Sequence, residues 1–159
     1  MSNPIKQLFR RAALRRARSE TPTALLPMKE VRSAVVFVDG MAANEDPAVA
    51  ARLAQRLLAD RGISVQVFCP QKKDLDWLGR PKAEARIPDG EDLFLSLAAS
   101  PGSFTADYEA RIRNARFKVG RYALAGKVFD LVVASSGPAG PDDQAKALPA
   151  ILEILDKVQ

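Results

Sequence analysis

Small polar and acidic residues follow two apolar runs that we expect to form strands, and they are the candidates for contacting a small ligand. They are Asp39 and Gly40, after residues 34–38, and Ser135, Ser136 and Gly137, after residues 129–134. In an open parallel sheet, ligands bind beyond the carboxyl ends of the strands. These serines and the neighbouring amides could hold an anion at the N-terminus of a following helix. They could equally end their strands without contacting any ligand.

The loop at 135–140 differs from known phosphate-binding loops. It has no Gly-x-Gly-x-x-Gly and no Gly-Lys-Ser/Thr sequence. Pro138 and Pro141 have no amide hydrogen to donate, and Asp142 and Asp143 would repel a phosphate. Binding of a small molecule or sugar nucleotide at the strand ends is therefore kept as the alternative hypothesis, and no cofactor is named.

The residue types of the chain exclude several classes of enzyme. The sequence has no histidine and a single cysteine, Cys69. Ser-His-Asp and Cys-His catalysis and zinc sites of Cys and His cannot be built from these residues. Asp39 ends a strand whereas Asp92 and Asp130 begin theirs, so the three carboxylates belong to opposite edges of a parallel sheet. We expect no metal site, no catalytic residue, and a buried, unreactive Cys69.

The positive charge of the chain is concentrated at its N-terminus. Residues 1–18 contain no acid and six cations, which are Lys6, Arg10, Arg11, Arg15, Arg16 and Arg18. The net charge of the whole chain is +5, so the remaining residues together carry −1. Basicity is thus a local property, and it points to a local contact with an anionic partner.

Residues 5–18 are predicted to form an amphipathic helix. Ile5, Leu8, Phe9, Ala12, Ala13 and Ala17 recur at three- and four-residue spacing, and the cations lie largely on the other side. One interpretation is a docking helix for RNA, the ribosome or an anionic membrane surface. Another is a helix packed on its own domain. An organelle-targeting peptide is also rich in arginine and poor in acids.

Two further stretches could contact a partner. Arg116, Lys118 and Arg121 form a basic strip on a short strand that could extend the polyanion-binding surface. We favour the alternative that Arg116 and Lys118 protect the edge of the sheet from pairing. Trp77 and Arg80 lie in the long polar connection at 71–90; a tryptophan there either packs onto the core, which we favour, or contacts a protein partner.

The order of elements predicts a single α/β domain at 31–159, preceded by the basic helix and linker at 1–30. Strands are expected at 34–38, 63–69, 92–97, 116–121 and 129–134, and later helices at 46–61, 104–115 and, capped by Asp142, up to about 157. The inner face of the middle helix is expected to be Phe104, Tyr108, Ile112 and Ala115. Alternating strands and helices predict a mostly parallel, Rossmann-like three-layer sandwich.

Three segments resemble a family of short bacterial proteins that have no assigned function. They are the Trp-Leu-Gly-Arg-Pro sequence within 74–82, the Ala-Arg-Phe-Lys-Val-Gly-Arg sequence within 114–122, and Phe-Asp-Leu-Val-Val at 129–133. The resemblance implies a basic N-terminal helix, a compact Rossmann-like domain and no known activity. The second segment is also similar to the N-terminal half of heptosyltransferase-like glycosyltransferases, in which two such domains enclose a sugar nucleotide.

We therefore expect a non-enzymatic accessory or binding protein that the N-terminal helix recruits to a polyanionic partner. A single cysteine fits a reducing compartment, and the N-terminus lacks the apolar block of a signal peptide. No apolar run is long enough to cross a membrane. The expected location is the cytoplasm.

Overall fold

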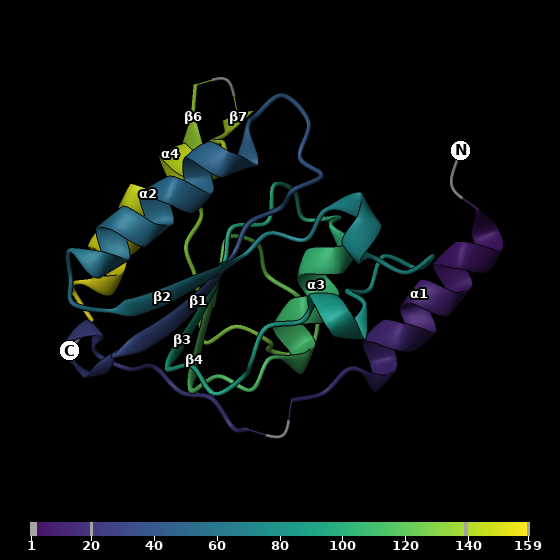
Figure 1. Cartoon of the computed structure of the whole chain (residues 1–159), viewed down its shortest axis with the longest axis horizontal. Coiled ribbons are helices and arrows are strands. Elements are labelled where there is room, and N and C mark those ends of the chain that lie inside the picture. Colours follow the sequence, from purple (N-terminus) through teal and green to yellow (C-terminus); the bar gives the residue numbers. More distant parts are fainter. Residues whose placement is uncertain (1–2, 20, 139, 159) are drawn as a thin grey trace.

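The computed structural model describes residues 3–19, 21–138 and 140–158 and contains a five-stranded parallel sheet. Residues 1, 2, 20, 139 and 159, which fall in the expected N-terminal segment, linker, loop and C-terminus, lie outside the described residues. The strand order is β2-β1-β3-β4-β5. The strands are β1 (Ser33–Phe37), β2 (Ser64–Phe68), β3 (Leu93–Ser96), β4 (Phe117–Gly120) and β5 (Leu131–Val132). The expected Rossmann-like α/β class is confirmed (Figure 1).

Helices cover both faces of this sheet. They are α1 (Pro4–Arg16), α2 (Pro47–Ala59), α3 (Phe104–Ile112) and α4 (Gln144–Leu155). Helices α2 and α4 pack together on one face, α3 lies on the other, and α1 lies outside α3 (Figure 1). Short 3₁₀ helices span Met28–Glu30, Lys72–Asp74 and Ala83–Ala85. The basic helix is thus packed on the domain, at the far side of the α3 layer.

The central strands are buried on both faces, as their continuous apolar sequences predict. In β1, Val36 is paired with Val67 of β2 on one side and Leu95 of β3 on the other. Val36 and Leu95 belong to the larger core, under α2 and α4, which includes Leu58, Leu148 and Ile151. Alternate residues, such as Val35 and Phe94, enter the smaller core under α3.

The caps of the helices follow from the sequence, with one correction. Asp46 accepts a hydrogen bond from the amide of Ala48, and Pro47 occupies the first position of α2, as predicted. The expected cap of α4 at Asp142 is wrong, because the cap is Asp143, which accepts from the Lys146 amide. Asp142 instead accepts a hydrogen bond from the hydroxyl of Ser135.

The expected inner face of α3 is only partly right, because Ala115 packs in the smaller core but Tyr108 and Ile112 do not. Ala106 and Ala110 pack in the core under α3. Tyr108 and Ile112 are only partly buried and line a cavity on the α1 side of the helix. The reason is that α1 covers the outer side of α3, so larger side chains have a partner there and small ones face the sheet.

The C-terminal strands differ most from expectation. β4 is not an edge strand, because it lies between β3 and β5. β5 spans two residues and leaves Val132 40% exposed, whereas a fully buried strand over 129–134 was expected. Part of the expected loop at 135–140 forms a small antiparallel hairpin, β6 (Ser136–Gly137) with β7 (Gly140–Pro141).

Candidate interface for an anionic partner

Helix α1 is attached to the domain by one of its own arginines. The side chain of Asn3 accepts hydrogen bonds from the amides of Ile5 and Lys6 and so caps the helix. Arg10 Nε donates to the carbonyl oxygen of Leu78 at 2.6 Å, and its guanidinium lies 4.7 Å from the centroid of the Phe104 ring. This cation–π contact and hydrogen bond leave Arg10 oriented inward, so it serves the fold more than the predicted polyanion surface.

The first two turns of α1 present large apolar side chains to solvent. Ile5, Leu8 and Phe9 are 62%, 66% and 50% exposed, so these three side chains do not pack closely on the domain. Phe9 lies edge-on to Trp77, with 5.7 Å between ring centroids. Trp77 is itself 59% exposed, so the expectation that it packs onto the core is wrong. We call Ile5, Leu8, Phe9 and Trp77 the apolar platform.

A tight loop holds Trp77 in this position. Oδ1 of Asp76 accepts hydrogen bonds from the amides of Leu78, Gly79 and Arg80, and Oδ2 forms an ion pair with Arg80 at 2.8 Å. Desolvation raises the pKa of Asp76, but the hydrogen bonds from Arg80 and the neighbouring amides outweigh it and lower the pKa. The predicted partner residue Arg80 thus supports the loop that presents Trp77.

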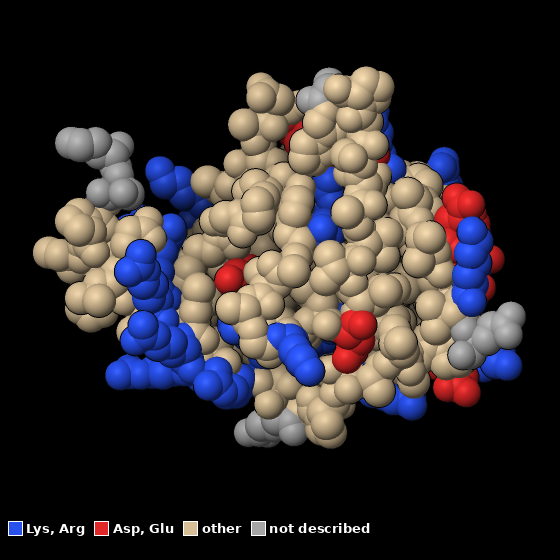
Figure 2. Space-filling view, turned by 180° about the vertical axis from the view of Figure 1, so that it is seen from behind, with Lys and Arg blue, Asp and Glu red and all other residues tan. Residues whose placement is uncertain are grey.

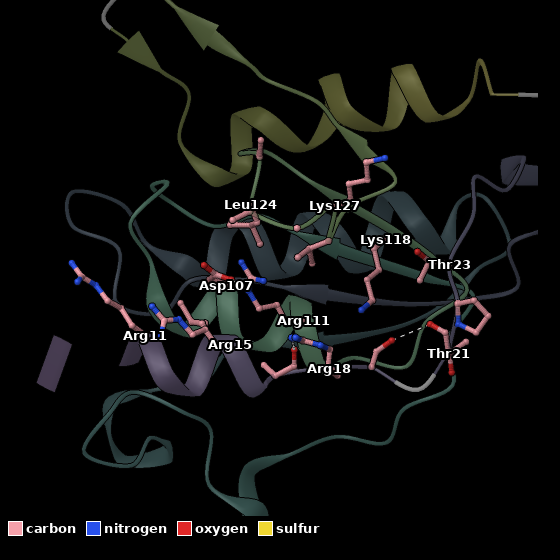
Figure 3. Close-up of a pocket in the computed structure, with 18 of the residues that line it drawn as sticks. Arg11, Arg15, Arg18, Thr21, Thr23, Asp107, Arg111, Lys118, Leu124 and Lys127 are labelled. Atoms are coloured by element: carbon pink, nitrogen blue, oxygen red, sulfur yellow. Dashed lines mark hydrogen bonds and ion pairs between the residues drawn. The ribbon is translucent and has the colours of Figure 1, made fainter. Parts of the chain in front are cut away.

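The other flank of α1 borders an open cavity of about 1170 Å³. Its walls are the C-terminal half of α1, the linker after it, α3, and the loop between β4 and β5. We call it the basic cavity, because its lining includes Arg11, Arg15, Arg18, Arg111, Lys118 and Lys127 and the single acid Asp107. Figure 3 shows Lys118 pointing from the sheet toward the space that Arg18 and Arg111 also border.

Lys118 is the buried cation of this cavity. The residue is 3% exposed, and its Nζ donates to the carbonyl oxygen of Ala110 at 2.8 Å. Burial lowers the pKa of Lys118 to about 8, against the opposing effect of Asp130 and more distant carboxylates. Within the residues that the structure describes, Lys118 has no carboxylate at ion-pair distance.

The remaining predicted basic residues are not gathered at one place. Arg116 pairs with Asp92 at the amino ends of the strands. Arg121 is buried and donates to the carbonyl oxygens of Ala98 and Asp142. The expectation of an exposed strip at Arg116, Lys118 and Arg121 is therefore wrong. It failed because β4 is an inner strand, whose side chains other elements cover.

Among the N-terminal cations, Arg11 and Arg15 of α1 and Arg18, which follows the helix, line the basic cavity. Arg16 lines a smaller cavity of about 430 Å³, beside Phe9 and Trp77, while Lys6 is partly exposed. Two cations of the basic cavity were not predicted, Arg111 and Lys127. Arg111 could not be predicted as a cavity residue, because its four-residue spacing from Asp107 is typical of an ordinary ion pair on a helix surface. The two residues do form that ion pair.

The residues of the alternative ligand hypothesis do not line any of these cavities. Asp39 is buried, and the side chain of Gln144 occupies its surroundings. The amide oxygen of Gln144 accepts from the Asp39 amide at 2.6 Å, and its nitrogen donates to the Asp39 carbonyl at 3.0 Å. Gly40 is half-buried, and Ser136 and Gly137 are exposed in the β6–β7 hairpin.

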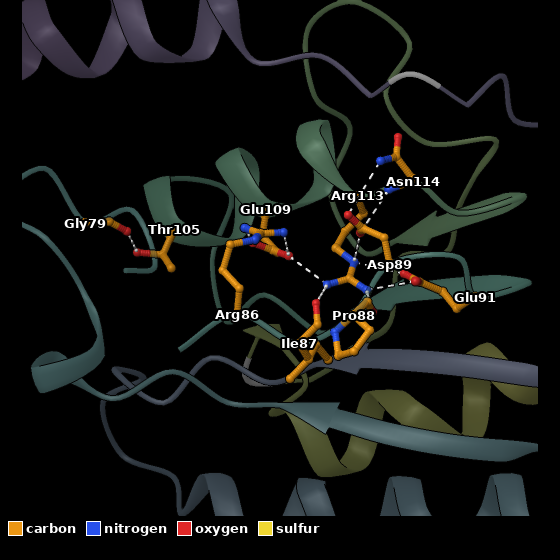
Figure 4. A network of polar contacts seen from close by, with 10 residues as sticks. All are labelled: Gly79, Arg86, Ile87, Pro88, Asp89, Glu91, Thr105, Glu109, Arg113 and Asn114. Carbon is orange, nitrogen blue, oxygen red and sulfur yellow. Dashed lines mark hydrogen bonds and ion pairs between the residues drawn. The ribbon is translucent and has the colours of Figure 1, made fainter. Parts of the chain in front are cut away.

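A buried ionic network supports α3 and was not predicted. Arg113 is fully buried and forms ion pairs with Glu91 at 2.8 Å and Glu109 at 3.2 Å (Figure 4). Glu109 is also buried and pairs with Arg86 at 2.9 Å. These charges satisfy one another, so we assign them to holding the 84–91 segment against α3 and not to a ligand.

Among the described residues, neither the Cys69 thiol nor the carboxylates form a group suited to nucleophilic or metal chemistry. Burial raises the pKa of the half-buried Cys69 thiol, and nearby Asp39 raises it further, which disfavours the thiolate. In the described ranges, no three Cys, Asp or Glu side chains converge in a way that could hold a metal ion.

Comparison of the chain with protein-family models, with curated proteins and with solved structures gives no match.

Proposed function

We propose that the protein is a non-enzymatic accessory protein that associates reversibly with an anionic membrane surface through α1 and Trp77. The observation that carries the proposal is the apolar platform. Its four large apolar side chains, three on α1 and Trp77 on the neighbouring loop, are each at least half exposed and lie beside the arginines of α1. Single exposed apolar residues are ordinary, but a contiguous group flanked by charge is typical of an interaction site.

The sequence allows three polyanionic partners, which are RNA, the ribosome and an anionic membrane surface. The apolar platform favours the membrane. Ile5 and Leu8 are aliphatic, so they neither stack on bases nor contact phosphates. Both could enter the boundary between headgroups and acyl chains, as the apolar face of an interfacial helix does. Tryptophan is enriched at that boundary, and Trp77 lies there in the proposed orientation.

The cations of α1 would supply the electrostatic part of the attraction. Figure 2 shows blue residues below a tan tip at the α1 side of the molecule. Arg11, Arg15 and Arg16 are exposed, and a cation near an anionic leaflet contributes about 1 kcal/mol of attraction. Arginines in the last turn also interact favourably with the helix dipole, so the basic half is a stable part of the helix.

The location that we propose is the cytoplasmic leaflet, which is the anionic one and faces the reducing compartment that a lone cysteine fits. In the part of the chain that the structure describes, no helix is both long and apolar enough to cross a bilayer. Contact with a membrane would thus be peripheral. It would need both the apolar platform and the cations, since either attraction alone is weak.

The test is cosedimentation with vesicles of phosphatidylglycerol and phosphatidylcholine. The wild-type protein should bind vesicles that contain the anionic lipid and not pure phosphatidylcholine, and binding should weaken as salt rises from about 0.1 M to about 0.5 M. Ile5→Ser with Leu8→Ser should weaken binding about tenfold, because two apolar side chains no longer enter the bilayer. Emission of Trp77, the only tryptophan, should shift to the blue on binding.

A matched control replaces two other exposed apolar residues in the same way. Val49 and Ile154, on α2 and α4, are 47% and 41% exposed and lie away from the platform in the fold. Val49→Ser with Ile154→Ser should bind vesicles like the wild type. Equal binding by both double variants, or binding of a structured RNA with no binding to vesicles, would overturn the membrane proposal.

A further inference from the structure

We propose that the basic cavity binds the phosphate group of an organic phosphate or a lipid headgroup. This is a site separate from the apolar platform, because it lies on the other flank of α1 and includes residues from α3, β4 and the β4–β5 loop. Arg11 and Arg15 belong to both proposals, but the inference does not depend on the proposed membrane function, since Arg111, Lys118 and Lys127 are not part of the helix that would contact a membrane.

The positive charge of the basic cavity is largely uncompensated. Six cationic residues line the cavity, against one acid, Asp107. That acid is already used, because it forms an ion pair with Arg111 on the same helix. In the described residues, Arg11, Arg15, Arg18 and Lys127 are not paired with any carboxylate. Like charges gathered around one space repel, and a bound anion would relieve that repulsion.

Lys118 is buried in the wall of the basic cavity. Buried lysines are usually paired with a carboxylate, because an isolated buried cation is costly. The ammonium group has three hydrogens to donate, and the Ala110 carbonyl accepts one hydrogen bond. Figure 3 shows its Nζ directed toward the cavity interior. A phosphate oxygen there would accept from Lys118 and provide the missing negative charge.

The size and the lining of the basic cavity also fit an organic phosphate. A cavity of about 1170 Å³ is large enough for a small organic molecule. Its walls are not wholly basic, since Leu14, Pro22, Leu124 and Val128 contribute apolar surface. This mixture favours a ligand with a charged phosphate and an attached carbon group over a bare inorganic ion. A free organic phosphate and a phospholipid headgroup share this chemistry.

The test measures binding by calorimetry at constant ionic strength, with glycerol 3-phosphate as the free probe and phosphatidylglycerol vesicles as the lipid probe. Lys118→Met should weaken binding about tenfold, because it removes a charged hydrogen bond at the centre of the site. Lys127→Asn is a second variant at an exposed loop position with φ of 55°, which asparagine tolerates. Lys73→Asn, at an exposed site in a 3₁₀ helix, is the matched control.

A free organic phosphate is supported if glycerol 3-phosphate binds saturably, and if both cavity variants weaken that binding while Lys73→Asn does not. Vesicle binding that the cavity variants weaken, without binding of the free probe, would support a lipid headgroup. If neither probe distinguishes the cavity variants from the control, the site does not exist. Failure of vesicle binding alone, with the free probe still bound, overturns only the membrane proposal.

Discussion

The Nζ of Lys118 donates a hydrogen bond to the carbonyl oxygen of Ala110 at 2.8 Å, and so joins the sheet to the end of α3. α3 ends at Ile112. In a longer helix the amide of Asn114 would donate to the carbonyl oxygen of Ala110, but here it donates to the carboxylate of Asp89. The carbonyl oxygen of Ala110 is therefore one of the groups that a helix leaves to other partners at its C-terminus. Lys118 has a structural contact and a cavity-facing charge at once.

This burial makes stability depend on pH. The pKa of Lys118 is about 8 in the folded chain and near its usual 10.5 when unfolded, so between these values the unfolded chain binds more protons. Stability contributed by this residue therefore rises with pH from about 8 to 10.5, by about 3 kcal/mol at most. Lys118→Met should remove that rise and should be more stable than the wild type near pH 7.

Urea unfolding from neutral to alkaline pH checks this, with the difference between wild type and variant as the measured quantity, because other groups titrate in both. The exposed Lys127 provides the control: Lys127→Asn should keep the wild-type pH dependence. A constant difference between Lys118→Met and wild type over the whole range would contradict a lowered pKa in the folded protein.

The buried network around Arg113 predicts a large effect of a nearly isosteric change. Glu109 accepts hydrogen bonds from Arg86 and Arg113, so Glu109→Gln leaves two cations with a neutral partner. The expected loss of unfolding free energy is roughly 3 kcal/mol, the usual cost of breaking a buried ion pair. Glu153→Gln, in an exposed pair at 4.0 Å, should have no measurable effect in the same denaturant titration. Similar stabilities of the two variants would refute the assigned role.

Much of the fold could be predicted because local sequence determines it. Continuous apolar runs identified β1 and β3, and Asp46-Pro47 identified the start of α2. The neighbours of β4 could not be predicted, since strand order depends on contacts between distant segments. For the same reason Lys118 was expected at an exposed edge and is instead buried between α3 and the sheet.

The candidate site was likewise predictable where local sequence determines it, and not where distant segments meet. Clustering in sequence identified the six N-terminal cations, because all of them lie within the first 18 residues. Arg111 and Lys127 come from distant elements and join the cavity only in the folded chain. The exposure of Ile5, Leu8 and Phe9 was also not predictable, since a periodic apolar pattern does not say whether a partner element covers it. Here α3 covers a different side of the helix.

Gly120 predicts a steric test of how the β4–β5 connection packs. A Cβ added there would lie 2.3 Å from Cε2 of Phe129, far inside van der Waals contact. Gly120→Ala should therefore lower the unfolding free energy by about 2 kcal/mol, as overpacking does. Combining it with Phe129→Leu should recover part of that loss, although Phe129→Leu alone destabilises. Additive effects in this double-mutant cycle would show that the cost of Gly120→Ala does not come from contact with the Phe129 ring.

Asp76 predicts a way to disturb Trp77 without unfolding the protein. Its carboxylate accepts three backbone hydrogen bonds and pairs with Arg80, so Asp76→Ala should free the loop and separate Trp77 from Phe9. We expect lower fluorescence anisotropy of Trp77, and a decrease of only about 1 kcal/mol in the global unfolding free energy.

Asp76→Asn is the matched variant, since its amide oxygen can still accept the three backbone hydrogen bonds while the ion pair to Arg80 is lost; its anisotropy should be intermediate. The pKa of Asp76 is lowered in the folded chain, so the loop should keep its order above the usual carboxylate pKa and lose it only in more acidic solution. If Asp76→Ala leaves the anisotropy unchanged, contacts of Leu78 and Gly79 with α1 and α3 hold the loop instead, because Arg10 and Thr105 donate to their carbonyl oxygens.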